Sequence, residues 1–388
     1  MKTLTLDVET TITNTGHPFT KDNKLMLVGI KRENGPTVIY DIEYTADPHR
    51  ESLEEIQVAV DSADVLVGFN IKFDLHWLQR YGIKFKDKRI WDCQLVEFIL
   101  RNQSNPYPSL NGTAEYYDLG TKLDEVKENY WKNGIDTDKI PLNILTEYLN
   151  QDVDLTYKVF QEQLKELESD DHKNKKTLIS LHNQDLLVLQ DIEFNGLQYE
   201  YQHSLTLGDE LDEQISKLDK KLYQYHNFEH FNPSSNVHLS CLLYGGSIPY
   251  RVQEESGVFK GGARQGEVKY KWVDKEFKLN KLFTPLPNTE LKREGQYKTN
   301  DDTLQRLQGN EEAMEVLQIL LTRATLEKRR GTYYIGVPAL SDTMGWTNNL
   351  LHGQLNQCVA KTGRLSSSKP NLQNFDSEIK SLFTTRYT

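Results

Sequence analysis

Cysteine and long apolar runs are both scarce in this sequence. Its three cysteines, Cys93, Cys241 and Cys358, lie far apart and match no zinc-binding spacing, so we expect buried thiols in a reducing cytoplasm. No apolar run approaches the ~20 residues that a membrane-spanning helix needs. The first residues already alternate as a strand does, which predicts that no signal peptide is present.

Internal repeats and low-complexity tracts are also absent. Hydrophobic residues make up 37% of the sequence and charged residues 27%, as in globular proteins. A chain of 388 residues is long enough for two or three domains. The polar segment LESDDHKNKK, residues 167–176, predicts a boundary that divides a first domain, 1–172, from the rest of the chain.

Charge is spread unevenly along the chain. The formal net charge is −11, which by itself disfavours binding to nucleic acid. Residues 251–388, however, hold 21 Lys and Arg against 16 Asp and Glu, a net of +5, so residues 1–250 carry −16. The basic part could follow phosphates, although charge of this size is also common on ordinary solvated surfaces.

Four acidic residues and one tyrosine stand in three short segments, LTLDVETT, FNIKFD and YLNQD. They are Asp7, Glu9, Asp74, Tyr148 and Asp152. Residues 2–8 alternate as a strand, so positions 7 and 9 share one face. Residues 72–81 are predicted to be a helix that begins near Asn70 and carries position 74. Residues 142–167 have helical spacing, so positions 148 and 152 lie one turn apart on one face.

Convergence of these acids would predict a metal site. Gathered carboxylates repel each other unless cations lie between them. Ligands that are all oxygen atoms suit hard cations such as Mg²⁺ or Mn²⁺. Two such ions about 4 Å apart can stabilise the attacking and leaving oxygens of a phosphoryl displacement. Each segment alone is common on solvated surfaces, whereas all three in this order are much rarer.

The three segments resemble the Exo I, Exo II and Exo III motifs of the DEDD 3′→5′ exonucleases, and the tyrosine of YLNQD is typical of the DEDDy branch. The resemblance implies an α/β RNase H-like fold, a mixed sheet with flanking helices. It also implies two divalent cations, Mg²⁺ or Mn²⁺, as cofactors. Their ligands would be Asp7, Glu9, Asp74 and Asp152.

The same resemblance implies roles for three further residues. Tyr148 would orient the attacking water as part of the catalytic set. Asn70 would support the site or touch the substrate, and Thr10 would approach the terminal nucleotide.

After residue 176 the pattern becomes mainly helical. The spacing of apolar residues predicts helices over 177–194, 205–225 and 311–334. Residues 251–296 interrupt this pattern, because they are rich in glycine and lysine and alternate around Tyr270. We expect one or two β-hairpins there. This insertion could contact DNA or a partner protein, or be plain surface.

From Leu181 onward the sequence resembles a family A DNA polymerase of the compact phage type. The most specific segment is KTGRLSSSKPNLQN, residues 361–374, which lines the primer–template duplex in that family. Residues 173–340 would then be a thumb-like, mainly α-helical region and residues 341–388 the start of the palm. The resemblance implies DNA contacts by Lys328, Arg330, Arg364, Asn371 and Asn374.

The motifs for nucleotide addition are missing from these residues. The sequence contains no D-Y-S-Q-like palm motif, no R-x-x-x-K-x-x-x-Y-G fingers helix and no H-D-E. We therefore expect the amino-terminal part of a polymerase. Either the polymerase is naturally split, with the rest of the palm and the fingers on a second polypeptide, or the chain is truncated.

The function that we expect is proofreading, in which two metals support hydrolysis of the 3′-terminal phosphodiester of DNA, together with primer–template binding. Two alternatives fit the same residues. One is a free-standing exonuclease for DNA or RNA with a polymerase-derived binding tail, which a comparison of DNA and RNA 3′ ends would separate. The other is a binding subunit with a vestigial site, which a nuclease assay would separate.

Overall fold

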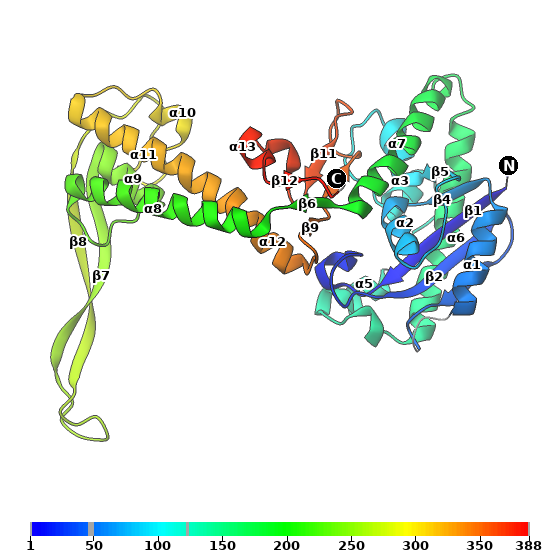
Figure 1. Ribbon diagram of the computed structural model, residues 1–388, viewed down its shortest axis with the longest axis horizontal. Coiled ribbons are helices and arrows are strands. Elements are labelled where there is room, and N and C mark those ends of the chain that lie inside the picture. The colour runs from blue at the N-terminus through cyan, green and yellow to red at the C-terminus, as the bar shows by residue number, and fades with distance from the viewer. Residues whose placement is uncertain (1, 46–49, 122–123, 387–388) are drawn as a thin grey trace. The chain divides into compact units, whose positions relative to one another are not determined.

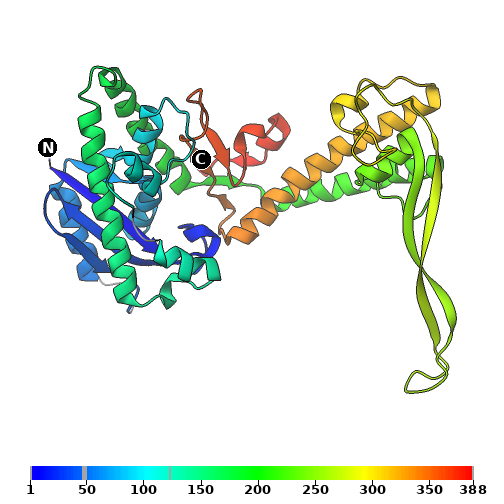
Figure 2. The ribbon, with the colours of Figure 1, turned by 180° about the vertical axis from the view of Figure 1, so that it is seen from behind.

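The chain folds into two compact units (Figures 1 and 2). The computed structural model describes residues 2–45, 50–121 and 124–386. The second unit is Gln202–Gly336, and the first unit holds the described residues on either side of it. No helix among the described residues is long and apolar enough to cross a membrane.

A five-stranded mixed sheet forms the centre of the first unit (Figure 1). Its order is β3-β2-β1-β4-β5. β2 is antiparallel to both of its neighbours, β1 and β3, while β4 and β5 run parallel to β1. The predicted mixed sheet with flanking helices is confirmed. The strands are β1 (Thr3–Thr10), β2 (Leu25–Arg32), β3 (Thr37–Asp41), β4 (Val65–Gly68) and β5 (Arg89–Asp92).

Helices cover both faces of this sheet. The longest, α6, packs across β1 to β4 on one face, while α1 and α2 share a core with the other face. α7 packs against β5 and α2. The helices of this part are α1 (Arg50–Ser62), α2 (Ile71–Arg80), α3 (Cys93–Leu100), α4 (Leu110–Tyr116), α5 (Glu125–Asn129), α6 (Leu142–Glu166) and α7 (Lys176–Asn195).

Alternation along β1 decides which side chains meet which helix. Leu4 and Leu6 are buried in the core that contains α1 and α2. Because successive side chains of a strand point to opposite faces, Asp7 and Glu9 point toward the α6 face. One strand therefore supplies apolar groups to one layer and carboxylates to the other.

The remaining elements of the first unit are short. β6 is the central strand of a small antiparallel sheet, and β10 pairs with β11. The predicted boundary near residue 172 lies between α6 and α7, which belong to the same compact unit, so the functional domain limits stay predictions. These elements are β6 (Leu197–Tyr199), α12 (Gly336–Met344), β9 (Leu350–Leu351), β10 (Gln354–Asn356), β11 (Ser366–Ser368), α13 (Ser377–Lys380) and β12 (Phe383–Thr384).

The second unit combines helices with one long hairpin of β7 and β8. The hairpin begins at Gly245, earlier than the predicted insertion at 251–296, and most of its side chains are exposed. Its proximal end packs through Ile248 and Leu279 into the helical core. The elements are α8 (Tyr201–His226), α9 (Asn236–Tyr244), β7 (Gly245–Val258), β8 (Val268–Lys281), α10 (Asp301–Leu304) and α11 (Glu311–Arg329).

All three cysteines are free and buried, as the sequence predicted.

Candidate active site

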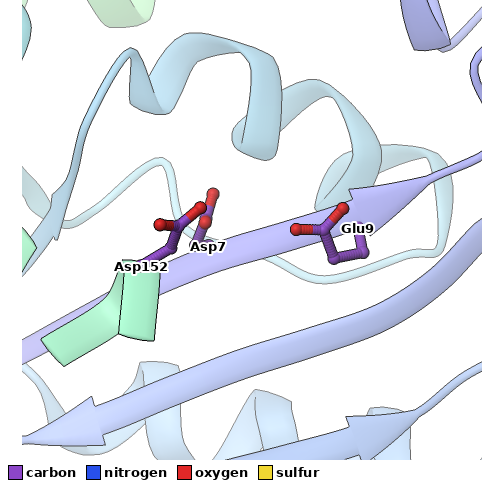
Figure 3. Close-up of side chains that lie close together, drawn as sticks. All are labelled: Asp7, Glu9 and Asp152. Carbon is purple, nitrogen blue, oxygen red and sulfur yellow. The ribbon is translucent and has the colours of Figure 1, made fainter. Parts of the chain in front are cut away.

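Three carboxylates from two elements converge at the end of the central strand. Asp7 and Glu9 come from β1, and Asp152 comes from α6. One oxygen from each lies within 4.8 Å of the others, and we call this group the carboxylate cluster (Figure 3). The predicted pairing of one strand face with one helix face thus brings these residues together.

Asp74 joins the cluster from the opposite layer. β4 ends at Gly68, so the backbone of β1 has no strand neighbour on that side beyond Thr5. α2 follows there, and the Oδ1 atom of Asp74 accepts a hydrogen bond from the backbone N–H of Val8 at 3.0 Å. Asp74 therefore both completes the strand's hydrogen bonding and places a fourth carboxyl group beside Asp7.

Burial and nearby negative charge raise the pKa of Asp74 and that of Tyr148. Asp74 is only 2% exposed, and burial followed by the nearby charge of Asp7 holds its pKa well above the usual range. Burial also raises the pKa of the Tyr148 hydroxyl, and the carboxylates of Asp152 and Glu9 add to the shift. The tyrosine is thus a protonated hydrogen-bond donor at neutral pH.

A pocket of about 510 Å³ opens beside the cluster, and we call it the carboxylate pocket. Thr10 and Asn70 line it together with all four acids, so six of the residues predicted from sequence share one cavity. The sequence analysis did not identify several other residues that line the pocket, because they lie in short 3-10 helices or, for Phe73, on a helix whose periodicity does not mark it as a site residue. The missed residues include Thr15, Gly16, Phe73 and Trp131.

Tyr148 lies one helical turn before Asp152 and packs edge-on against Trp131, with ring centroids 5.6 Å apart. Trp131 lines the carboxylate pocket, while Tyr148 lines the hollow next to it with Asp124 and Lys127. The tryptophan therefore connects the tyrosine to the cluster and limits the directions in which its ring can lie.

Asn70 is held at the start of α2 by a residue that the sequence analysis did not identify. Its backbone is left-handed, with φ of 61°, and its N–H donates to Asp92 at 3.0 Å. Asp92 also caps α3 by accepting from Gln94. Burial raises the pKa of Asp92 to about 6. The position of Asp92 at the end of a strand and directly before a helix is the signal that could have indicated it.

The donor set fits a hard divalent cation. All four acids offer carboxylate oxygens, and among the residues that the structure describes no cysteine or histidine belongs to the cluster. Buried like charges at this spacing become favourable when a cation lies between them. Asp7, Glu9, Asp74 and Asp152 are therefore the residues that could hold such a metal.

The predicted DNA-contacting residues lie outside the carboxylate pocket. Arg364 is exposed in the turn between β10 and β11, and Asn374 is exposed beyond β11. Asn371 accepts hydrogen bonds from Ser367 and Gln373, so its side-chain oxygen has a local structural role.

Two more of these residues belong to the second unit. Lys328 is exposed in the last turn of α11. Arg330 is partly buried and lies 2.6 Å from Asp212 on α8. The structure thus gives the arginine a partner within the fold, whereas the lysine extends into solvent.

Comparison with known families assigns both ends of the chain. Residues 1–168 match the family described as 3′-5′ exonuclease, and residues 275–387 match DNA polymerase family A. The sequence analysis gave a resemblance to polymerases from Leu181 onward, whereas the match to the polymerase family begins at residue 275.

Individual relatives are polymerases of bacteria and phages. The chain is 26% identical over 306 residues to DNA polymerase I of a Synechocystis species, covering 79% of this chain and 26% of that protein. It is 23% identical to the DNA polymerase of Bacillus phage SP01, and the match covers 96% of this chain and 42% of that protein. It is 21% identical to DNA polymerase DpoZ of Acinetobacter phage SH-Ab 15497, and the match covers 95% of this chain and 55% of that protein.

Among solved structures, the fold is similar to that of the POL domain of Pol1 from M. smegmatis, in a complex with DNA primer–template and dNTP. The TM-score is 0.65 at 16% identity, covering 98% of this chain and 54% of that one. The chain spans roughly a quarter to a half of the length of these relatives.

Proposed function

Because the chain carries a 3′-5′ exonuclease domain over residues 1–168 and a DNA polymerase family A region over residues 275–387, we propose that it is the proofreading part of a family A DNA polymerase. Its reaction is hydrolysis of the 3′-terminal phosphodiester of single-stranded or frayed DNA, with release of a deoxynucleoside monophosphate. The observation that carries this proposal is the convergence of Asp7, Glu9 and Asp152 within 4.8 Å, with Asp74 beside them.

The four acids would hold two divalent cations, Mg²⁺ or Mn²⁺. Asp7 and Asp152 would hold one, and Glu9 and Asp74 would complete the second site. Bound there, such cations would supply Lewis-acid activation of water and neutralisation of developing negative charge. The carboxylates of Glu9, Asp74 and Asp152 are buried and held at fixed positions, which limits reorganisation during the reaction.

Tyr148 orients the attacking water. Its raised pKa keeps the hydroxyl protonated, so it donates a hydrogen bond to the nucleophile from a ring that Trp131 holds in place. Thr10 and Asn70 line the same pocket as the acids and position the terminal nucleotide.

Duplex DNA is the second ligand that we propose. Lys328 and Arg364 are exposed cations in the region related to the polymerase family, and they supply phosphate or minor-groove contacts. Asn371, Asn374 and Arg330 are proposed to assist. Because Arg330 is paired with Asp212, its contribution requires that it exchange or share that partner.

The palm and fingers needed for nucleotide addition come from a second polypeptide, or from a further part of the polymerase of which this chain is a piece. A stripe of exposed apolar side chains on α7 supports such a contact, since stripes of this kind mark interaction surfaces. It consists of Leu178, Leu181, Val188 and Ile192. Co-purification with a polypeptide that carries the missing motifs tests this part, and failure to associate would contradict it.

Digestion of labelled strands tests the central proposal. The purified chain is incubated with a single-stranded DNA labelled at its 5′ end, with Mg²⁺ or with a chelator, and products are separated by length. We expect stepwise shortening from the 3′ end only with the metal. An RNA strand of the same sequence serves as the comparison, and equal or faster RNA digestion would favour the free-standing exonuclease over proofreading. The absence of metal-dependent shortening would leave only the binding-subunit hypothesis.

A further inference from the structure

Glu193, near the end of α7, has a buried side chain that joins three elements. It is 6% exposed. Its Oε1 lies 2.6 Å from the Nζ of Lys72, and its Oε2 lies 2.8 Å from the Nε2 of His76. The backbone N–H of Leu355 also donates to Oε1. One carboxylate therefore binds α2 and β10 together.

The contacts with Glu193 fix the helix that supplies Asp74. Lys72 and His76 are four residues apart on α2 and thus share one face. Asp74 lies between them in sequence and, at about 100° per residue, on the opposite side of the helix. It reaches the N–H of Val8 from there. α2 is therefore held from behind by Glu193 while its front supplies a carboxyl group to the carboxylate pocket.

Lys72, Glu193 and Leu355 of β10 are each hydrogen-bonded to the other two. Lys72 donates to the carbonyl of Leu355 as well as to Glu193, and Leu355 donates back to Glu193. The Nδ1 of His352 lies 2.9 Å from the backbone carbonyl of Glu193. Residues 352–356 are thereby attached to α2 and α7, and this segment lies within the match to DNA polymerase family A.

A second contact reaches the other wall of the carboxylate pocket. Thr15 and Gly16 line that pocket, and Asn14 donates to the carbonyl of Thr343 at 2.9 Å. Phe19 stacks on His352 with ring centroids 3.8 Å apart. The loop that follows Glu9 is therefore docked on the same carboxy-terminal segment as α2.

The conformation of this loop depends on its surroundings. Asn14 and Thr15 both have left-handed backbones, with φ of 50° and 61°. A left-handed conformation at residues other than glycine costs free energy and persists only where neighbouring contacts enforce it. The contacts with residues 343–352 are among those that do so.

Glu193 is held as an anion despite its burial. Burial alone would raise its pKa, but the hydrogen bond from His76 and the charge of Lys72 outweigh that effect and lower it. Removal of one partner from such a buried set leaves an uncompensated charge. Neutralising Glu193 therefore weakens the hold on α2 and on β10 together.

We propose that Glu193 is a positioning residue of the exonuclease site, which fixes α2 and its Asp74 against the polymerase-family segment 352–356. The competence of the site for metal binding then depends on that segment being docked. The consequence for activity rests on the proposed exonuclease function, whereas the structural coupling does not.

Glu193→Gln tests this coupling, because it keeps the shape and one oxygen acceptor but removes the charge. Asp191→Asn is the matched control. Asp191 lies on the same helix and pairs with Lys86 at 2.5 Å, but both side chains are exposed. Circular dichroism and thermal melting verify that each variant is folded.

Hydrogen exchange supplies the readout that is independent of activity. In Glu193→Gln, amides of α2 and of residues 354–356 should exchange faster together, by at least several-fold, with no change in α11. Asp191→Asn should leave both segments as in the wild type. Unchanged exchange in the folded Glu193→Gln protein, or faster exchange of one segment alone, would overturn the proposed coupling.

Metal dependence supplies the functional readout. The Mg²⁺ concentration for half-maximal exonuclease rate should rise roughly tenfold in Glu193→Gln, and saturating Mg²⁺ should restore most of the rate. A general loss of folded protein would instead lower the rate at every Mg²⁺ concentration. Glu193→Asp keeps the charge, so its half-maximal Mg²⁺ concentration should lie between those of the wild type and Glu193→Gln. An inactive wild type would refute the proposed function, whereas an active wild type with an unshifted Glu193→Gln would refute the positioning role.

Discussion

The first unit gathers buried like charges at one site in addition to pairing opposite charges, whereas buried Arg323 of the second unit is paired with a charge of opposite sign. In the first unit, three carboxylates converge within 4.8 Å and buried Asp74 lies beside them. In the second unit, Arg323 is buried against α8 and lies 2.6 Å from Asp219. Opposite charges that pair hold a fold together, whereas like charges gathered in one pocket raise its free energy until a cation binds.

This difference gives a way to separate function from structure. A charge with a partner of opposite sign is expected to affect stability when it is changed. A charge gathered with others of the same sign is expected to affect metal binding and catalysis, and its neutralisation can even relieve repulsion. The substitutions below test this contrast in order of expected effect.

Asp152→Asn should have the largest effect. It removes one charge from the carboxylate cluster with little change in shape, so the rate of 3′-nucleotide release should fall about 10³-fold, or roughly 4 kcal/mol. Asp154→Asn on the same helix is the control, since Asp154 pairs with Lys31 and Thr37 instead. Single-turnover digestion measures both rates. Equal losses in the two variants would contradict a special role of the cluster.

Tyr148→Phe should have a smaller effect, because the acids remain in place. Loss of the donating hydroxyl should slow the reaction about 10- to 100-fold, while the Mg²⁺ requirement stays unchanged. The ring contact with Trp131 is kept by phenylalanine, so the melting temperature should not fall. A raised Mg²⁺ requirement in this variant would show instead that the tyrosine supports the metal ligands.

Acid should weaken the first unit through two buried histidines. Burial lowers the pKa of His17 to about 3 and that of His352 to about 4, and neighbouring histidines and the cations of Lys369 and Arg386 add to these shifts. The unfolded chain then binds more protons than the folded one below about pH 6.5, so stability falls as the pH drops from there toward 4.

The expected loss between pH 7.5 and 5.5 is on the order of 1 kcal/mol per histidine. Denaturant unfolding at the two pH values measures it. His352→Gln keeps a donor for the carbonyl of Glu193 but cannot titrate, so it should reduce the slope. An equal slope in the variant would exclude His352 as a cause.

Lys328→Ala and Arg330→Ala should have the smallest effects, the first on DNA binding and the second on stability. Lys328 is exposed, so its removal should weaken DNA binding and reduce the salt dependence by about one phosphate contact. Arg330 is paired with Asp212, so its removal should mainly lower stability, by about 1 kcal/mol or less. Fluorescence titration with a primer–template at several salt concentrations, followed by thermal melting, measures both. A larger DNA effect for Arg330 would show that its ion pair opens on binding.

Local periodicity was enough to predict most of the carboxylate cluster. A strand places positions 7 and 9 on one face, and a helix places 148 and 152 on another, because these relations depend only on the repeat of each element. The mixed sheet, the long hairpin near residue 270 and the buried cysteines could also be predicted. The start of the hairpin could not, because the two glycines after α9 indicate that the helix ends but not that a strand begins there.

Other site features depend on contacts between segments far apart in the chain. Asp92 holds Asn70 only because β5 ends beside the start of α2. Trp131 contacts Tyr148 from a 3-10 helix that is too short to give a periodic signal. Glu193 looks like any acidic residue of an amphipathic helix until Lys72, His76 and Leu355 are found around it.

The sequence by itself determined which acids the candidate site contains, in which order they occur, and on which faces of a strand and two helices they lie. The tertiary structure alone decided that these acids meet in one pocket, and that α2 is attached to a segment more than 270 residues further along the chain, through the buried carboxylate of Glu193 and directly through Lys72. The reason is physical. Side-chain direction within an element follows from backbone geometry, whereas burial, shared hydrogen bonds and like-charge contact arise only when the elements pack together.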